Sequence, residues 1–262
     1  MKKSWRYGVA GVVSLMSCLW LPLAGAQAAE WEWTIAPYLW GSDLSLDLAA
    51  NNEPVIGGDV SFSDLLDKIE AAVPVHFEGR AGKPGFFVDV LYLSVGDDST
   101  IPPNPPLPGG TTIHSELDSG FYEAGGLYRF IDDGQALDLL YGARVIDMSQ
   151  KHDVALPSPS TLTTTIKTSD TLLDGFIGLR YAHSIGDRWD FLIRGDMGAG
   201  DTELTWNFIG TFGVRFGTTG TYSMRFGWRY LDVDVETRST SGIEVETDLV
   251  LSGPVVAMVF TL

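Results

Sequence analysis

The sequence is poor in cysteine and in positive charge. Its 262 residues include a single cysteine, Cys18, so a disulfide framework and a multi-cysteine metal cluster are both excluded. Lys and Arg together number 17, against 34 Asp and Glu, and the formal net charge is −17. Because a nucleic-acid partner requires a basic surface that neutralises phosphates, this balance argues against nucleic-acid binding.

Long apolar runs are confined to the N-terminus. Positive residues precede an apolar run over 7–23, and Ala26-Gln27-Ala28 supplies an A-x-A cleavage pattern. This pattern predicts a secretory signal peptide over 1–28, cleaved near Ala28, and a single domain over 29–262. Two alternatives remain open: an N-terminal anchor helix, because the run is nearly long enough to span a membrane, and a lipoprotein signal ending at Cys18.

The remainder of the chain alternates apolar and polar residues with period two. Within 203–217, for example, Trp206 and Phe208 share one face while Thr205 and Asn207 share the other, which a helix cannot produce. The pattern predicts about ten β-strands, with eight or twelve as alternatives. Their expected ranges are 31–48, 72–81, 86–97, 113–130, 136–154, 164–184, 188–200, 203–217, 221–238 and 243–262.

Short and long connections alternate along these strands. Tight turns are expected after the even strands, at 82–85, 132–134, 186–188 and 218–220. Longer connections follow most odd strands, at 49–71, 98–112, 155–163 and 239–242, and the link at 200–202 is a short exception. This alternation is typical of an all-β, antiparallel transmembrane β-barrel with short periplasmic turns and long extracellular loops.

The direction of the apolar faces decides between a membrane barrel and a soluble secreted barrel or sandwich. A soluble protein would turn these faces inward. Aromatic residues instead gather near both strand ends, which is typical of the two interfacial belts of a membrane barrel. At the short-turn ends they are Trp31, Trp33, Tyr128, Phe130, Tyr181, Trp189, Phe216, Tyr222 and Phe260, and at the opposite ends Tyr92, Tyr122, Trp206, Trp228 and Tyr230.

The last strand carries a family resemblance. Val256, Met258, Phe260 and Leu262 form one apolar face that resembles the sorting strand of Gram-negative outer-membrane barrels, although the usual final Phe is displaced by two residues. The segment 36–41, with 62–67, 127–130 and 142–144, is similar to a poorly characterised group of bacterial outer-membrane proteins of similar length. The resemblance implies recognition by the barrel-assembly machinery and brings no known activity.

Charged residues occupy the faces opposite the aromatic ones, so we expect them to line the lumen. One hypothesis is a salt-bridge plug that closes a narrow barrel; the other is a small passive channel that favours anions. Because ten strands lie near the small end of the barrel range, the plug is favoured. The lumen-lining candidates are Glu78, Arg80, Asp89, Glu123, Arg129, Arg144, Arg180, Arg194, Arg215, Arg225 and Arg229.

The segment 61–70 has the one helical pattern. Ser61 with Asp64 makes a capping-box-like start. In the first outer loop this helix is expected to close the barrel mouth as a lid, to lie at the membrane surface, or merely to pack the loop. As a lid it would gate a conduit or binder for hydrophobic ligands, our second functional hypothesis. The residues expected on its apolar face are Phe62, Leu65, Leu66 and Ile69.

Acidic residues at spacing two mark the last hairpin. They are in phase with the apolar outer faces, and they either share divalent cations with lipid phosphates or form a solvated loop. They are Asp232, Asp234, Glu236, Glu244, Glu246 and Asp248. In phase with the lumen, Val233 and Val235 would make the mouth apolar. The proline-rich stretch 102–108 is expected to be a stiff exposed loop.

Evidence for catalysis is weak. Neither G-x-S-x-G nor H-E-x-x-H occurs, and His114 beside Ser115 and Glu116 does not by itself establish a catalytic arrangement. A lipid-modifying enzyme is therefore the third hypothesis. The leading expectation is a monomeric channel or envelope-structural barrel, without catalytic, cofactor or metal site, in contact with outer-membrane lipid and lipopolysaccharide.

Overall fold

The computed structural model describes residues 30–50, 53–100, 111–157, 163–217, 221–238 and 244–262. Residues Trp31–Leu262 form one compact unit. The signal peptide and its cleavage near Ala28, the proline-rich stretch and the loop 239–242 lie outside the described residues, so these remain expectations.

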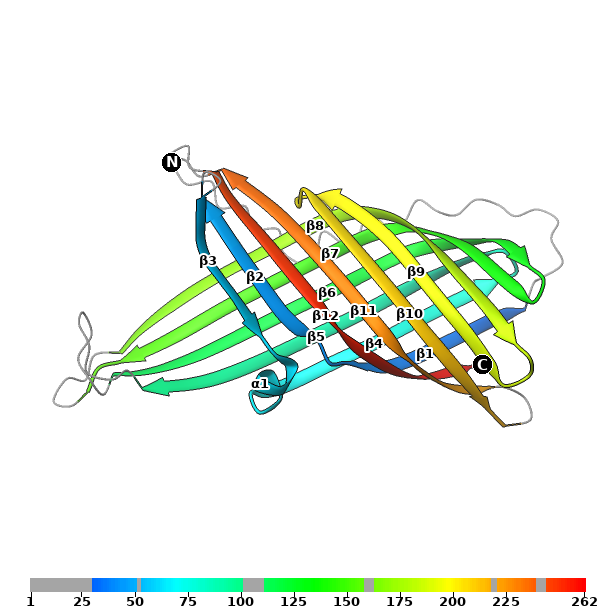
Figure 1. Ribbon diagram of the computed structural model, residues 1–262, viewed down its shortest axis with the longest axis horizontal. Helices are drawn as coiled ribbons and strands as arrows, with labels where there is room; N and C mark the ends of the chain where they lie inside the picture. Colours follow the sequence, from blue (N-terminus) through cyan, green and yellow to red (C-terminus); the bar gives the residue numbers. More distant parts are fainter. Residues whose placement is uncertain (1–29, 51–52, 101–110, 158–162, 218–220, 239–243) are drawn as a thin grey trace. The chain divides into compact units, whose positions relative to one another are not determined.

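The described part of the chain forms twelve strands joined in one antiparallel sheet (Figure 1). Ten of them, β1 and β4 to β12, close into a barrel through the pairing of β1 with β12. This confirms the expected all-β barrel of about ten strands. The strands are β1 (Trp31–Trp40), β2 (Asp43–Ala50), β3 (Glu53–Val60), β4 (Ile69–Ala81), β5 (Pro84–Thr100), β6 (Thr112–Asp132), β7 (Gln135–Ala155), β8 (Thr163–Ile185), β9 (Trp189–Gly200), β10 (Leu204–Phe216), β11 (Tyr222–Arg238) and β12 (Glu244–Thr261).

The first expected strand, 31–48, is broken in two. β1 pairs with β12 as far as Trp40, and β2 then continues along the same partner from Asp43. β3 returns on β2, so strand occupies much of what we expected to be the long connection 49–71. At this break, the backbone of β12 lies close to the backbone of Gly41. A Cβ on Gly253 would lie 2.0 Å from the carbonyl oxygen of Gly41.

Turn glycines define one end of the barrel. Gly82, Gly134 and Gly186 connect β4 to β5, β6 to β7 and β8 to β9, and their φ angles are 67°, 64° and 65°, where a side chain would be strained. Thr34 near the start of β1 pairs with Thr261 at the end of β12, so both strand ends lie at this short-turn end. In outer-membrane barrels, the end that carries the short turns is the periplasmic one.

The helical segment is shorter than expected. α1 covers Phe62–Leu66, and its N-cap Ser61 accepts a hydrogen bond from the backbone N–H of Asp64, as the sequence predicted. Ile69 is not on the helix: it is the first residue of β4 and pairs with Val95. The strand ladder with β5 therefore overrides the helical spacing of the last expected residue.

Large apolar side chains cover the outside of the barrel. Phe212 and Trp228 are 54% and 51% exposed, whereas Arg144 and Glu123 are 0% and 1% exposed. A soluble barrel would show the reverse arrangement, so the wall is built to face lipid. In the described part of the chain, no helix is long and apolar enough to cross a membrane.

Candidate functional site

The barrel interior brings the charged candidates together. All eleven predicted lumen residues are buried or half-buried, and they form two groups at different depths. One group fills the middle of the barrel and is called the plug here. The other lines a cavity at the short-turn end, called the vestibule.

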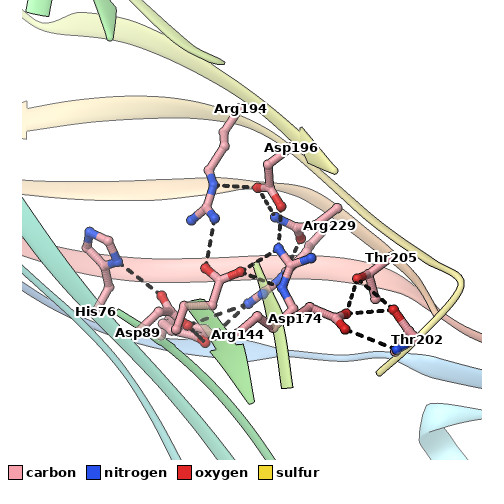
Figure 2. A network of polar contacts seen from close by, with 12 residues as sticks. His76, Asp89, Arg144, Asp174, Arg194, Asp196, Thr202, Thr205 and Arg229 are labelled. Carbon is pink, nitrogen blue, oxygen red and sulfur yellow. Dashed lines mark hydrogen bonds and ion pairs between the residues drawn. The ribbon is translucent and has the colours of Figure 1, made fainter. Parts of the chain in front are cut away.

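The centre of the plug is a closed ring of four charges. Arg144 Nη2 donates to Glu123 Oε1 at 2.6 Å and also binds Asp196. Arg194 completes the ring by donating to Asp196 Oδ2 at 2.8 Å and to Glu123 Oε2 at 2.7 Å. Figure 2 shows three of these side chains, Arg144 from β7 with Arg194 and Asp196 from β9, while Glu123 belongs to β6. Two arginines and two carboxylates therefore neutralise one another.

A chain of hydrogen bonds extends the plug toward the closing strands. Asn207 donates to Asp196 at 2.9 Å and accepts from Arg229 Nε at 3.1 Å. Arg229 Nη1 donates to the Tyr38 hydroxyl at 3.2 Å, and that hydroxyl donates to Asp89 at 2.8 Å. The network thereby links β9, β10 and β11 to β1 and β5 across the lumen.

His76 ends this chain on the opposite wall. Its Nδ1 lies 3.0 Å from Asp89 Oδ2, and its Nε2 lies 3.7 Å from Glu78. Figure 2 shows the His76 ring directed at Asp89. His76, Asp89 and Glu78 therefore form one charge network.

Aromatic rings pack against the plug arginines. The Arg144 guanidinium lies 5.1 Å from the ring centres of both Phe121 and Phe176, and that of Arg229 lies 4.7 Å from Trp40. Such cation–π contacts hold a desolvated guanidinium in place. The plug is therefore packed and not merely paired.

An apolar layer covers the plug on the side of the long loops. Phe121, Ile146, Leu231 and Val233 are at most 5% exposed and pack together. Partly buried apolar side chains surround them: Trp40, Leu91, Leu172, Val235, Leu249 and Leu251. The inward phase of Val233 and Val235 is as the sequence predicted, and the layer is filled by its own side chains.

The vestibule is a cavity of about 480 Å³ at the short-turn end. Its lining includes residues of the β6–β7 turn and of the short-turn ends of β1 and β12, such as Gly134, Glu32 and Thr261. Seven of the predicted arginines line it: the plug residues Arg194 and Arg229, and outside the plug Arg80, Arg129, Arg180, Arg215 and Arg225.

Carboxylates in the vestibule are shared between arginines. Asp138 accepts from Arg129 Nε at 2.7 Å and from Arg180 Nη2 at 2.7 Å. Asp190 accepts from Arg215 Nε at 3.2 Å and also pairs with Arg225. Glu78 binds Arg180 at 2.5 Å.

Sequence reasoning did not single out several members of these networks. Asp138, Asp190 and Asp196 are in phase with the lumen arginines, so the period-two pattern contained enough signal to find them. Tyr38 and Asn207 carried no such signal, because their roles depend on partners far away in the sequence.

A second polar group lies on the parts of β5, β6 and β7 that are farthest from the short turns. His114 Nδ1 lies 2.7 Å from Asp98 and its Nε2 lies 3.2 Å from Glu116. The pKa of His114 is raised above its usual value, because its ring donates hydrogen bonds to the carboxylates of Asp98 and Glu116, and both favour the imidazolium. Asp98 has the larger effect. Lys151 Nζ in turn donates to Glu116 at 3.1 Å.

Ser115 and His152 form a separate pair on the inward face. His152 Nδ1 lies 2.9 Å from Ser115 Oγ. The neighbouring Asp97, which is the cross-strand partner of Ser115, is bound to Lys68 at 2.9 Å. A hydroxyl and a histidine, two of the three groups of a nucleophilic triad, are thus in contact. The adjacent carboxylate of Asp97 binds Lys68 and not His152.

Asp232 and Asp234 of the acidic hairpin alternate with the buried Leu231 and Val233, so they lie on the outer face of the wall. Asp234 of β11 is opposite Asp248 of β12, which is opposite Asp47 of β2. The described residues contain no group of three or more His, Cys, Asp or Glu arranged to hold a metal ion. The cation-sharing hypothesis for this hairpin remains a prediction.

Comparison with known proteins identifies the architecture. No protein-family model and no curated protein matches the chain. Among solved structures, the outer membrane protease OmpT from Escherichia coli is similar over 91% of this chain and 99% of its own, with a TM-score of 0.53 and 8% identity. The chain has the fold of a Gram-negative outer-membrane β-barrel.

Other outer-membrane barrels match at lower scores. Ail of Yersinia pestis is similar over 86% of this chain and 99% of its own, with 11% identity and a TM-score of 0.33. The toluene transporter TbuX of Ralstonia pickettii covers 90% of each chain, with 11% identity and a TM-score of 0.30. The similarity to OmpT, at 8% identity, shows the fold and assigns no activity.

Proposed function

We propose that this protein is a closed, envelope-structural barrel of the outer membrane that does not conduct in its resting state. The plug carries the proposal, because Arg144 and Glu123 leave essentially no surface exposed to water. A solute on this path would have to separate buried ion pairs, and leaving a buried charge unpaired is costly. The apolar layer beyond the plug adds a second barrier to ions.

Planar-bilayer recording tests the closed state. Folded wild-type protein is expected to give no single-channel steps. The paired substitution Glu123→Ala and Arg144→Ala empties the centre of the plug and is expected to produce them. Arg188→Ala in the exposed β8–β9 turn is the control and should remain silent. Regular steps from the wild-type protein would show a passive channel and refute the closed barrel.

The proposed setting of this barrel follows from its two faces and its C-terminal strand. We propose delivery by the signal peptide over 1–28, insertion by the barrel-assembly machinery, and a monomer surrounded by lipid and lipopolysaccharide. Cell fractionation with heat-modifiable gel migration tests this setting. Recovery of the processed protein as a soluble periplasmic species would refute it.

A binder or conduit for hydrophobic ligands is the second candidate. The apolar inner face around Val233 favours it, while the close packing of that face favours the closed barrel. α1 lies at the broken strand, where the ring of Phe62 is 3.2 Å from a Cβ built on Gly41. Saturable uptake of an apolar fluorescent probe that is abolished by Phe62→Asp or Leu66→Asp would support this candidate over the closed barrel.

A further inference from the structure

The vestibule contains more buried positive than negative charge. At the plug, each arginine has a carboxylate partner: Arg144 pairs with Glu123, Arg194 with Asp196 and Arg229 with Asp89. Besides the plug residues Asp89, Arg194 and Arg229, which also reach this cavity, the vestibule is lined by five arginines, namely Arg80, Arg129, Arg180, Arg215 and Arg225, and by three buried carboxylates, namely Glu78, Asp138 and Asp190. This local excess stands out in a protein whose net charge is −17.

The remaining carboxylates near the vestibule lie in water at its rim. Glu32 pairs with Arg80 at 3.2 Å and Asp132 with Arg129 at 3.3 Å, but their side chains are 53% and 73% exposed. Ion pairs to solvated carboxylates are weak and are screened by salt. They therefore do not neutralise the buried excess.

The geometry of the β9–β11 wall concentrates this charge. Asp190 and Arg225 flank Gly213 in one row across β9, β10 and β11. A Cβ on Gly213 would lie 2.5 Å from Asp190 Oδ1, so the glycine leaves room for the carboxylate to meet two guanidiniums. Arg180 and Arg215 are both close enough to act electrostatically on Arg225.

Donor groups in this region also exceed their acceptors. Two guanidinium nitrogens of the lining, Arg80 Nη1 and Arg229 Nη2, are buried without a hydrogen-bond partner in the described structure. A guanidinium has five N–H donors and no acceptor, so five arginines around three carboxylates leave donors for a ligand. Buried donors without partners are costly, and an oxyanion would satisfy them.

We propose that the vestibule binds a small oxyanion with several negative charges, carrying phosphate-type groups, that enters from the periplasm. Planar guanidiniums match such groups through paired, charge-assisted hydrogen bonds. The cavity volume is within the range of small-molecule sites. Because the plug closes the other end, the ligand binds and leaves on one side, and the site is distinct from any transport path.

Isothermal titration calorimetry with inorganic pyrophosphate tests the site on the folded protein in a nonionic detergent. We expect saturable binding that weakens as salt rises. The paired substitution Arg215→Gln and Arg225→Gln should weaken binding by at least about tenfold, because each removes a charge-assisted hydrogen bond. Arg80→Gln, whose pairing partner is exposed, provides a second variant, and Arg188→Gln in the turn is the matched control. Heat-modifiable migration verifies folding of each variant.

A lipid headgroup offers the same phosphate chemistry, so dihexanoyl phosphatidylglycerol forms a second arm. Arginine-dependent binding of pyrophosphate supports a free oxyanion, and arginine-dependent binding of the lipid alone supports a headgroup. Absence of binding in both arms overturns the proposal. Equal binding by wild type and by the folded arginine variants overturns it as well, whatever the bilayer recordings show about conduction.

Discussion

At the scale of single residues, the interior is organised by shared charge. Glu123 and Arg144 are direct cross-strand partners, and Asp196 reaches the same guanidinium from β9. Each acid in the ring binds two arginines, and each arginine binds two acids. Removing one member leaves buried charge without compensation, whereas replacing a whole pair by apolar groups does not.

Arg144→Ala is therefore expected to lower the free energy of unfolding by about 3–5 kcal/mol. Urea unfolding of the protein folded in lipid vesicles measures this loss. Arg188→Ala, in an exposed turn, should change the same quantity by no more than about 0.5 kcal/mol.

The pair Arg144→Met and Glu123→Leu separates pairing from packing. The free energy of unfolding of this double variant is expected to lie closer to wild type than that of Arg144→Ala, because the carboxylate at position 123 that would lose its arginine is removed as well. A double variant at least as unstable as the sum of its two single variants would contradict this account of the plug.

His114 is expected to titrate above the ordinary histidine value of 6.5, because Asp98 and Glu116 favour its charged form. Its contribution to stability is then fully present below about pH 6.5 and is lost as pH rises through the raised pKa. NMR titration of the His114 ring measures this directly. The upward shift should shrink in Asp98→Asn, and an unshifted titration in the wild type would count against the two hydrogen bonds.

At the scale of elements, the break between β1 and β2 is the main departure from a regular barrel. β12 pairs with β1 along one part of its length and with β2 along another, and its Gly253 lies against the backbone of Gly41. The period-two pattern runs through this point without interruption, so alternation alone could not locate the break. The same limit applies to α1, where Ile69 fits a helical face in sequence and joins a strand in the structure.

Gly253→Val should destabilise the barrel by about 1–3 kcal/mol, because its side chain would displace the backbone of β1. Gly195→Val is a matched control, since a Cβ there meets nothing within 4 Å and valine favours strands. Thermal loss of heat-modifiable migration compares the two. Equal midpoints would indicate that β1 and β12 are not packed so closely at the break.

At the scale of the whole molecule, stability depends on the apolar wall facing lipid. Phe212 lies on the outer face of β10 between the aromatic residues Trp206 and Phe216 and is 54% exposed. Phe212→Lys should cost about 2–4 kcal/mol in vesicles, whereas Phe216→Lys near the interface should cost about 0–1 kcal/mol. Unfolding titrations in vesicles measure both. Similar small costs at the two depths would mean that this face is not in the bilayer.

The sequence alone determined the strand period, the turn positions and the sidedness of the wall, because these are local properties of alternation, glycine placement and aromatic position. Only the tertiary structure decided which interior charges meet. Arg180 binds Glu78 from 102 residues away, and Arg229 binds Tyr38 from 191 residues away. Such partners depend on how barrel closure aligns distant strands, and alternation within one strand contains no information about that alignment.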